Sequence, residues 1–153
     1  MFIKHELENR LAAAVERAQS LNLLPAASLP EIAIERPQQS EHGDLASGLP
    51  LRLARAARMA PLEIAEKLIP LIECDDVVQH VWAAPPGFIN FALKESWLTA
   101  QVESIRQAGD TYGNITVGEG QKVQLEFVSV NPTGPVHVGH ARGAILGSAL
   151  ATV

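Results

Sequence analysis

Two histidines three positions apart, His137 and His140, have the type and spacing that could do chemistry in this chain of 153 residues. Gly139 lies between them, and a loop with two prolines and a glycine, residues 131–136, precedes them. If a helix begins near Val138, both imidazoles can face one pocket at its N-terminus. Free N–H groups and the positive end of the helix dipole favour an anion there. The stretch therefore predicts an anion site.

Three interpretations of the histidine pair are open. As hydrogen-bond donors, the imidazoles would bind phosphate oxygens and stabilise the negative charge that grows as a phosphate–phosphate bond breaks. As metal ligands, they would need a third and a fourth ligand, and neither a cysteine nor a His-Glu-x-x-His pattern lies nearby. As ordinary loop and cap residues, they would bind no ligand. Gly139 favours the first interpretation, because a position without a side chain lets a flat ring lie against the backbone.

Glu126 lies near the end of an apolar run, residues 123–128, that predicts a β-strand. A buried carboxylate in such a strand needs a cationic or N–H partner. The amine or guanidinium of a ligand would serve, and so would a lysine from a missing part of the domain. Ser129 and Asn131 follow and could share a face with Glu126. The alternative for Ser129 and Asn131 is that they only cap the loop.

The elements around this site predict the opening of a second domain. The strand at 123–128, the loop at 131–136 and a helix at 139–153 make one strand–loop–helix unit, and no neighbouring parallel strand is available to pair with it. We therefore expect this domain, residues 122–153, to be truncated. Residues 109–121 contain few candidates for a core and several glycines, which predicts a linker.

The first 108 residues predict a small α+β domain with an antiparallel sheet. Its expected elements are a helix at 2–24, a strand at 30–36, a helix at 45–59, a helix from Pro61, strands at 76–83 and 88–94 with a tight turn between them, and a helix from 95 to 108. Asp44 is the expected N-cap of the 45–59 helix, and Pro50 should kink or split that helix. Gly109 suits the position after the last helix.

The composition limits the kinds of partner. Hydrophobic residues make up 47% of the chain, which is enough for a packed core, and the net charge is −5. A bulk electrostatic attraction to nucleic acid is therefore not indicated, and an RNA contact would need a local basic patch. Arg52, Arg55 and Arg58 recur every three residues and could form such a patch. The alternative is a solvated helix face.

Cysteine usage and hydropathy point to the cytoplasm. Cys74 is the single cysteine, so a disulfide framework and a cysteine-based zinc site are both excluded, as in a reducing cytosol. Charged residues at positions 4, 6, 8 and 10 argue against a signal peptide. The sequence has no run of about 18 apolar residues, so we expect no membrane span.

Three strings of this sequence resemble one family. Residues 126–142 resemble class I aminoacyl-tRNA synthetases, whose signature His-Ile-Gly-His appears here as His-Val-Gly-His at 137–140. The string at 126–135 is similar to arginyl-tRNA synthetases in particular. Glu-His-Gly-Asp at 41–44 and Pro-Gly-Phe-Ile-Asn-Phe at 86–91 resemble the N-terminal additional domain of that family. The three strings in order are more specific than His-x-Gly-His alone, which other nucleotidylyltransferases share.

The resemblance implies roles for the residues around the histidines. His137 and His140 would bind the phosphates of ATP and stabilise the transition state of adenylation. Gly139 would let the adenine approach the backbone. The residues that match the arginine site of the family are Glu126, Ser129, Asn131 and His140.

The resemblance also implies a tRNA contact in the first domain. Phe88 and Asn90 match positions that touch the D-loop of tRNA in the family. An aromatic ring can stack on an unpaired base, and an amide can hydrogen-bond to the edge of a base. The alternative for Phe88 is core packing in a hairpin.

The resemblance covers essentially the whole chain. It implies an N-terminal additional tRNA-binding domain at 1–108, a linker at 109–121, and at 122–153 the start of a truncated Rossmann-type catalytic domain. The parent would be a monomeric, cytoplasmic arginine–tRNA ligase that uses ATP and Mg²⁺ and charges tRNA(Arg). The lysine-rich second signature and an anticodon-binding domain are absent from these 153 residues, so the chain alone should not catalyse. The alternatives are a free-standing tRNA-binding module and a fragment of another His-x-Gly-His nucleotidylyltransferase.

Overall fold

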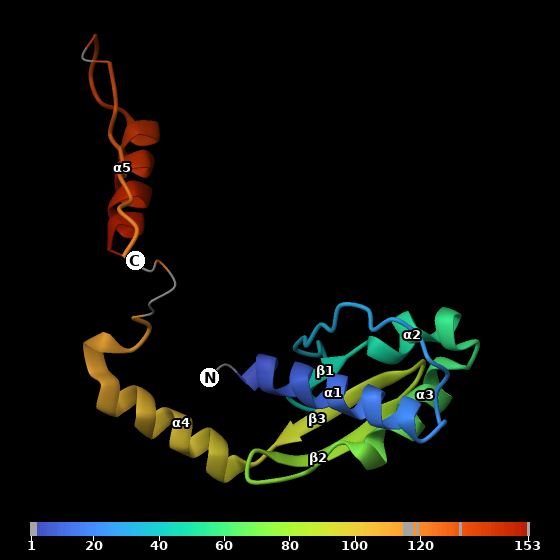
Figure 1. The fold of residues 1–153 in the computed structure, drawn as a ribbon. Helices are drawn as coiled ribbons and strands as arrows, with labels where there is room; N and C mark the ends of the chain where they lie inside the picture. Colours follow the sequence, from blue (N-terminus) through green and yellow to red (C-terminus); the bar gives the residue numbers. More distant parts are fainter. Residues whose placement is uncertain (1–2, 115–117, 119, 132, 153) are drawn as a thin grey trace. The chain divides into compact units, whose positions relative to one another are not determined.

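The computed structural model describes residues 3–114, 118, 120–131 and 133–152, and the chain divides into two compact units, Met1–Asp110 and Thr111–Val153 (Figure 1). The boundary falls at the start of the predicted linker. The first residue of the predicted N-terminal helix, parts of the linker, one loop proline and the last residue of the chain lie outside the described residues. The domain boundaries at 108 and 122 stay a prediction.

The described residues of the first unit form one antiparallel sheet in the order β1-β3-β2. The strands are β1 (Leu45–Ser47), β2 (Val78–Ala84) and β3 (Phe88–Leu93). The predicted hairpin is confirmed: β2 and β3 are joined by a tight turn, in which the N–H of Gly87 donates to the carbonyl of Ala84 at 2.9 Å. Because β3 lies in the centre of the sheet, Asn90 is held between Ala46 on β1 and Trp82 on β2.

The helices that share a core with this sheet are α1 (Ile3–Ser20), α2 (Leu49–Ala57) and α3 (Pro61–Leu68). The helix α4 (Glu95–Ala108) follows β3 and has no buried residue. The core combines the apolar stripe of α1, which includes Leu7 and Leu11, with Ile64 of α3 and Phe91 of β3. All four of these side chains are fully buried. A scarcity of aromatic residues thus leaves an aliphatic core around one central phenylalanine.

The helix predicted at 2–24 ends earlier, at Ser20. Asn22 adopts a left-handed conformation with φ +57°, and the N–H of Leu23 donates to the carbonyl of Ala18 at 2.8 Å. This is the hydrogen bond that closes a Schellman-type helix end. Asparagine is one of the few residues that tolerate that conformation, so the chain leaves the helix there.

The helix predicted at 45–59 is wrong in its first turn. Leu45–Ser47 is strand β1, and the helix begins only at Leu49, with Pro50 in its first turn, where a missing N–H costs nothing. Asp44 is therefore not a helix cap. Its Oδ2 accepts a hydrogen bond from the N–H of Leu93 at 2.8 Å, which ties the start of β1 to the end of β3.

The strand predicted at 30–36 is reduced to a single antiparallel bridge. The N–H of Glu35 donates to the carbonyl of Ala46 at 2.9 Å, and the N–H of Ala46 donates back at 2.8 Å. Pro37 follows directly and cannot donate to a ladder, so the pairing does not extend. The bridge nevertheless fixes this segment along the free edge of β1.

In the second unit, the helix α5 (Val138–Ala151) confirms the predicted helix. The strand predicted at 123–128 is wrong for the described structure, because residues 120–131 contain no strand. A strand needs a neighbour to pair with, and the described residues of the second unit include no other strand. Val128 has φ +59°, which interrupts the extended run, and Phe127 packs against the buried Gly147 of α5 instead. None of the described helices has the length and apolar character that crossing a membrane requires.

Candidate functional site

The two histidines cap the N-terminus of α5 with their own side chains. Nδ1 of His137 accepts a hydrogen bond from the N–H of Gly139 at 3.1 Å, and Nδ1 of His140 accepts from the N–H of His137 at 3.3 Å. The rings stack with their centroids 3.7 Å apart and their planes 24° apart. Because each Nδ1 acts as an acceptor, each neutral ring carries its proton on Nε2. The pair therefore retains one Nε2–H donor on each ring.

Gly139 lies under the ring of His137. A Cβ atom built at Gly139 would lie 3.0 Å from Cε1 and 3.1 Å from Nδ1 of His137. A side chain at this position would push the ring away from the backbone N–H that it accepts from. The pattern His-x-Gly-His thus suits this cap, because it supplies two accepting imidazoles three positions apart and no side chain under the first ring.

The loop before α5 and the two histidines line an open cavity of about 470 Å³. Its lining residues are Ser129, Val130, Asn131, Thr133, Gly134, Pro135, His137 and His140. Of the predicted arginine-site residues, the structure brings together Ser129, Asn131 and His140. Glu126 is exposed and is not part of the lining, because the strand that would aim it at this face is not formed.

No group of three or more His, Cys, Asp or Glu side chains gathers among the described residues. The histidine pair therefore has no third ligand of these types in the described part of the chain. Both Nδ1 atoms are already engaged by backbone N–H groups. The arrangement suits hydrogen-bond donation from Nε2 to an anion more directly than metal coordination.

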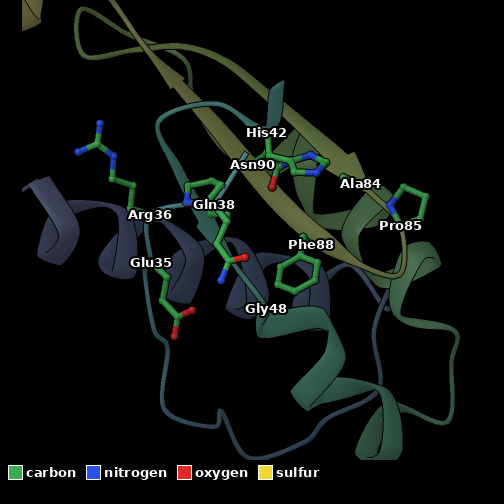
Figure 2. A pocket seen from close by; sticks show the side chains of 11 residues that line it. Glu35, Arg36, Gln38, His42, Gly48, Ala84, Pro85, Phe88 and Asn90 are labelled. Atoms are coloured by element: carbon green, nitrogen blue, oxygen red, sulfur yellow. The ribbon is translucent and has the colours of Figure 1, made fainter. Parts of the chain in front are cut away.

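A second cavity, of about 310 Å³, lies in the first unit (Figure 2). Its lining residues are Glu35, Arg36, Pro37, Gln38, His42, Ala46, Gly48, Ala84, Pro85, Phe88 and Asn90. They come from the segment fixed to the edge of β1, from strand β3 and from the turn between β2 and β3. Both residues predicted to contact tRNA, Phe88 and Asn90, thus line the same cavity.

The string Glu-His-Gly-Asp at 41–44 contributes His42 to the lining of this cavity. Gly43 has φ +82°, and a Cβ atom there would lie 2.6 Å from the carbonyl oxygen of Phe91 and 2.6 Å from the ring of Trp82. The backbone can therefore press against the sheet only with glycine at this position. The preceding short helix η1 (Ser40–His42) then brings the imidazole of His42 to the cavity.

Asn90 is a buried amide without a complete set of partners. Its side chain is 1% exposed, and its Nδ2 makes no hydrogen bond to any described residue. Ser47 is equally buried, but its Oγ donates to the carbonyl of Ala33 at 2.9 Å. A buried donor without an acceptor costs about 1–3 kcal/mol. Asn90 therefore leaves one buried hydrogen-bond donor without an acceptor among the described residues, in the wall of the cavity.

Phe88 combines packing with exposure. It is the first residue of β3, and 36% of its surface is exposed, whereas Phe91 on the same strand is fully buried. The ring lies in the cavity wall, as Figure 2 shows. Core packing thus accounts for only part of its surface, and the rest can contact a ligand.

Sequence reasoning missed Arg36 and Gln38 as cavity residues. Arg36 is exposed and makes no hydrogen bond to a described residue. The only local signal was their position between a short apolar run and a polar loop. Their place became clear only from the bridge that fixes this segment to β1.

The predicted arginine patch is only partly a helix face. Arg52 and Arg55 are exposed on α2, but Arg58 lies beyond its end, with φ +53°. Nη1 of Arg52 donates to the carbonyl of Glu31 at 2.9 Å. The three side chains therefore do not share one helical stripe. Arg55 does not line the cavity of Figure 2, which favours the alternative, a solvated helix face, for this residue.

One ion-pair cluster has a structural role. The guanidinium of Arg10 pairs with Glu6 and with Asp75, whose Oδ2 lies 2.7 Å from Nη2. The hydrogen bond from Arg10, helped by the N–H groups of Val78 and Val77, holds the pKa of Asp75 far below its ordinary value. The cluster ties α1 to the segment that leads into β2.

The fold and the sites define a chain that combines a small α+β domain, with a polar cavity on its sheet, and a helix whose N-terminus is capped by two histidines. Residues 3–93 match the family model described as "Arginyl tRNA synthetase N terminal domain", and the chain belongs to this family.

The curated relatives extend the similarity beyond that domain. The chain is 46% identical over 151 residues to an "Arginine--tRNA ligase" of Dehalococcoides mccartyi (strain CBDB1), and 43% identical over 152 residues to one of Geobacillus thermodenitrificans. Each alignment covers 99% of this chain and 27% of the relative. The chain therefore spans about a quarter of the length of these relatives.

Solved structures show the same fold. The structure of Thermus thermophilus arginyl-tRNA synthetase matches with a TM-score of 0.61 at 24% identity, over 98% of this chain and 23% of that chain. The arginyl-tRNA synthetase of Plasmodium falciparum matches with a TM-score of 0.69 at 15% identity, over 97% of this chain and 27% of that chain. At these identities, the likeness concerns the fold alone.

Proposed function

We propose that this chain is the N-terminal part of an arginine–tRNA ligase, in which residues 1–108 contact tRNA(Arg) and residues 122–153 open the catalytic domain. The observation that supports this most strongly is the 46% identity to a ligase over 151 residues, which include the His-Val-Gly-His stretch. The parent would activate arginine with ATP and transfer it to its tRNA.

In the parent, the N-terminus of α5 would hold the phosphates of ATP. His137 and His140 would donate their Nε2–H groups to phosphate oxygens, and the first N–H groups of the helix would add to the positive potential. As the carboxylate of arginine attacks the α-phosphorus, pyrophosphate leaves with growing negative charge, which these donors stabilise. Mg²⁺ would accompany the phosphates of ATP and neutralise part of their charge.

The arginine site would use Glu126, Ser129, Asn131 and His140. Three of these residues already border one cavity. A parallel neighbour from the rest of the catalytic domain would order residues 123–128 as a strand and aim Glu126 at the guanidinium of the substrate. This strand–loop–helix would then be the first step of the Rossmann-type domain.

The tRNA contact would lie at the cavity of the first unit. An unpaired base of the D-loop would stack on the exposed part of the Phe88 ring, and its edge would supply the acceptor that Nδ2 of Asn90 lacks. Such a contact depends on shape and hydrogen bonds rather than on bulk charge, which agrees with the net charge of −5. We further propose a cytoplasmic, monomeric parent, whose partners are tRNA(Arg), arginine and ATP.

Pyrophosphate exchange with the full-length protein tests this proposal. We expect exchange between pyrophosphate and ATP that depends on arginine and that is absent with lysine or other amino acids. Exchange supported equally by other amino acids would favour a different His-x-Gly-His nucleotidylyltransferase. An open reading frame that stops directly after Val153 would favour a free-standing tRNA-binding module.

A further inference from the structure

Phe88 borders two cavities, not one. Beside the cavity of Figure 2 lies a smaller one of about 220 Å³. Its lining residues are Ala33, Glu35, Gly48, Leu49, Leu51, Arg52 and Phe88. Glu35, Gly48 and Phe88 line both cavities, so they form the common wall between them.

The two cavities differ in chemistry. The first contains the unpartnered amide of Asn90, the imidazole of His42 and the amide of Gln38, which can hydrogen-bond to the edge of a base. The second has the apolar side chains of Leu49 and Leu51. It is smaller than the sites of drug-sized ligands, about 300–1,000 Å³, and suits one planar ring. The first cavity therefore offers three side chains that can hydrogen-bond to a base and that the second lacks, whereas the second offers Leu49 and Leu51 for stacking.

Each cavity has its own arginine. Arg36 lines only the first and makes no hydrogen bond to a described residue. Arg52 lines only the second, and its Nη1 donates to the carbonyl of Glu31 at 2.9 Å, which holds the guanidinium in place and leaves its other N–H groups available for a ligand. With one arginine beside each cavity, two bases in the two cavities could each have their phosphate paired with a guanidinium.

We propose that this site binds two consecutive unpaired nucleotides, with one base in each cavity, the Phe88 ring between them, and Arg36 and Arg52 at the phosphates. The proposal rests on the RNA contact proposed above for Phe88 and Asn90, and it adds a second base and a second phosphate. The carboxylate of Glu35, in the common wall, can accept a hydrogen bond from the exocyclic amine of a base, which favours adenine or cytosine over uracil.

Titration of the 153-residue chain with two probes, followed through its backbone amide resonances, tests the proposal. The probes are adenosine 5′-monophosphate and the 5′-phosphorylated adenine dinucleotide. We expect the mononucleotide to shift the amides of Gln38 and Asn90. The dinucleotide should also shift Leu51 and Arg52 and bind about tenfold more tightly, because a stacked base contributes about 1–3 kcal/mol.

Two variants separate the second site from the first. Arg52→Gln should abolish the advantage of the dinucleotide and leave the dissociation constant of the mononucleotide unchanged. Arg55→Gln is the matched control, since it removes the same charge from the same exposed helix but lines neither cavity. Thermal unfolding, monitored by circular dichroism, should show that both variants are folded at the temperature of the titration, with Arg52→Gln lowered slightly by the loss of its hydrogen bond to Glu31.

The outcomes distinguish the two-nucleotide site from the single-base contact on which it rests. A dinucleotide that binds no more tightly than the mononucleotide, with Leu51 and Arg52 unshifted, overturns the two-nucleotide site and leaves the single-base contact standing. Equal losses of dinucleotide affinity in Arg52→Gln and Arg55→Gln also overturn it, because general charge would then explain the effect. If neither probe shifts Gln38 or Asn90, the proposed RNA contact itself fails.

Discussion

Substitution of Phe88 by alanine separates the packing of this ring from its contact with RNA. Complete burial of a phenylalanine side chain contributes about 1.5–3 kcal/mol. Phe88 keeps 36% of its surface exposed, so the loss in unfolding free energy should be about two-thirds of that amount, about 1–2 kcal/mol. Phe91, on the same strand, is fully buried, and Phe91→Ala should cost about 3–5 kcal/mol.

The same substitution should also weaken RNA binding. Stacking of a base on an aromatic ring contributes about 1–3 kcal/mol, which corresponds to an increase of about 5- to 150-fold in the dissociation constant. Fluorescence anisotropy with a labelled tRNA(Arg) transcript measures this affinity, and urea unfolding of the same protein measures its stability. Phe88→Leu is the matched control, because it keeps apolar volume in the cavity wall but removes the π-face.

If Phe88 is a ligand contact, its substitutions should change the unfolding free energy and the RNA affinity to different extents. Phe88→Leu should stay close to the unmodified chain in unfolding free energy and resemble Phe88→Ala in RNA affinity. If Phe88→Ala destabilises the chain as much as Phe91→Ala and leaves the RNA affinity unchanged, then the ring is only a part of the core. The interpretation of Phe88 as a ligand contact would then be wrong.

Three further predictions concern other parts of the chain. Asp75→Asn should lower the free energy of urea unfolding by about 1 kcal/mol near neutral pH. The ion pair with Arg10 lowers the pKa of Asp75, so its contribution to stability is present above the pKa of the unfolded carboxyl, about 4. The difference in unfolding free energy between the two proteins should therefore shrink as the pH falls below that value. Gly43→Ala should lower the unfolding free energy by about 1–3 kcal/mol in the same assay, since φ of Gly43 is +82° and the added methyl would lie 2.6 Å from the carbonyl oxygen of Phe91. An unchanged urea midpoint would contradict that geometry. His140→Ala in the full-length ligase should lower the rate of arginine-dependent pyrophosphate exchange by about a hundredfold. The melting temperature of the first unit should stay unaltered. A normal exchange rate would refute the role of His140 at the phosphates.

Elements with strong local signals could be predicted from the sequence. Pro61 at the start of α3, Gly109 after α4 and the short turn between β2 and β3 all fall where the sequence places them. Each of these boundaries is set by the backbone preference of one or two residues. The same holds for the cap of α5, where the histidine spacing alone predicts that both rings gather at the helix N-terminus.

Elements that depend on a distant partner could not be predicted. Leu45–Ser47 continues an apolar pattern that also suits a helix, and only its pairing with β3 makes it a strand. Residues 123–128 show the opposite case, because a sequence typical of a strand stays without one where no neighbour exists. Glu126 is left exposed for the same reason.

The cavities were beyond sequence reasoning as well. Phe88 and Asn90 were identified by resemblance, but nothing in the sequence indicates that Asn90 is a buried amide without an acceptor or that Phe88 separates two cavities. The segment that supplies Glu35 and Arg36 to these cavities is fixed by the bridge between Glu35 and Ala46, a long-range contact of one residue pair. Such contacts have no periodic signature in the chain.

Ribose footprinting of a tRNA(Arg) transcript with the 153-residue chain tests the central claim most directly. The account predicts that protection is confined to the unpaired nucleotides of the D-loop and is lost with Asn90→Ala, while Arg55→Gln leaves it intact. Protection of the acceptor stem or the anticodon loop in its place, or a D-loop footprint that survives Asn90→Ala, would contradict the assignment of the first unit as the part that contacts the D-loop through this cavity.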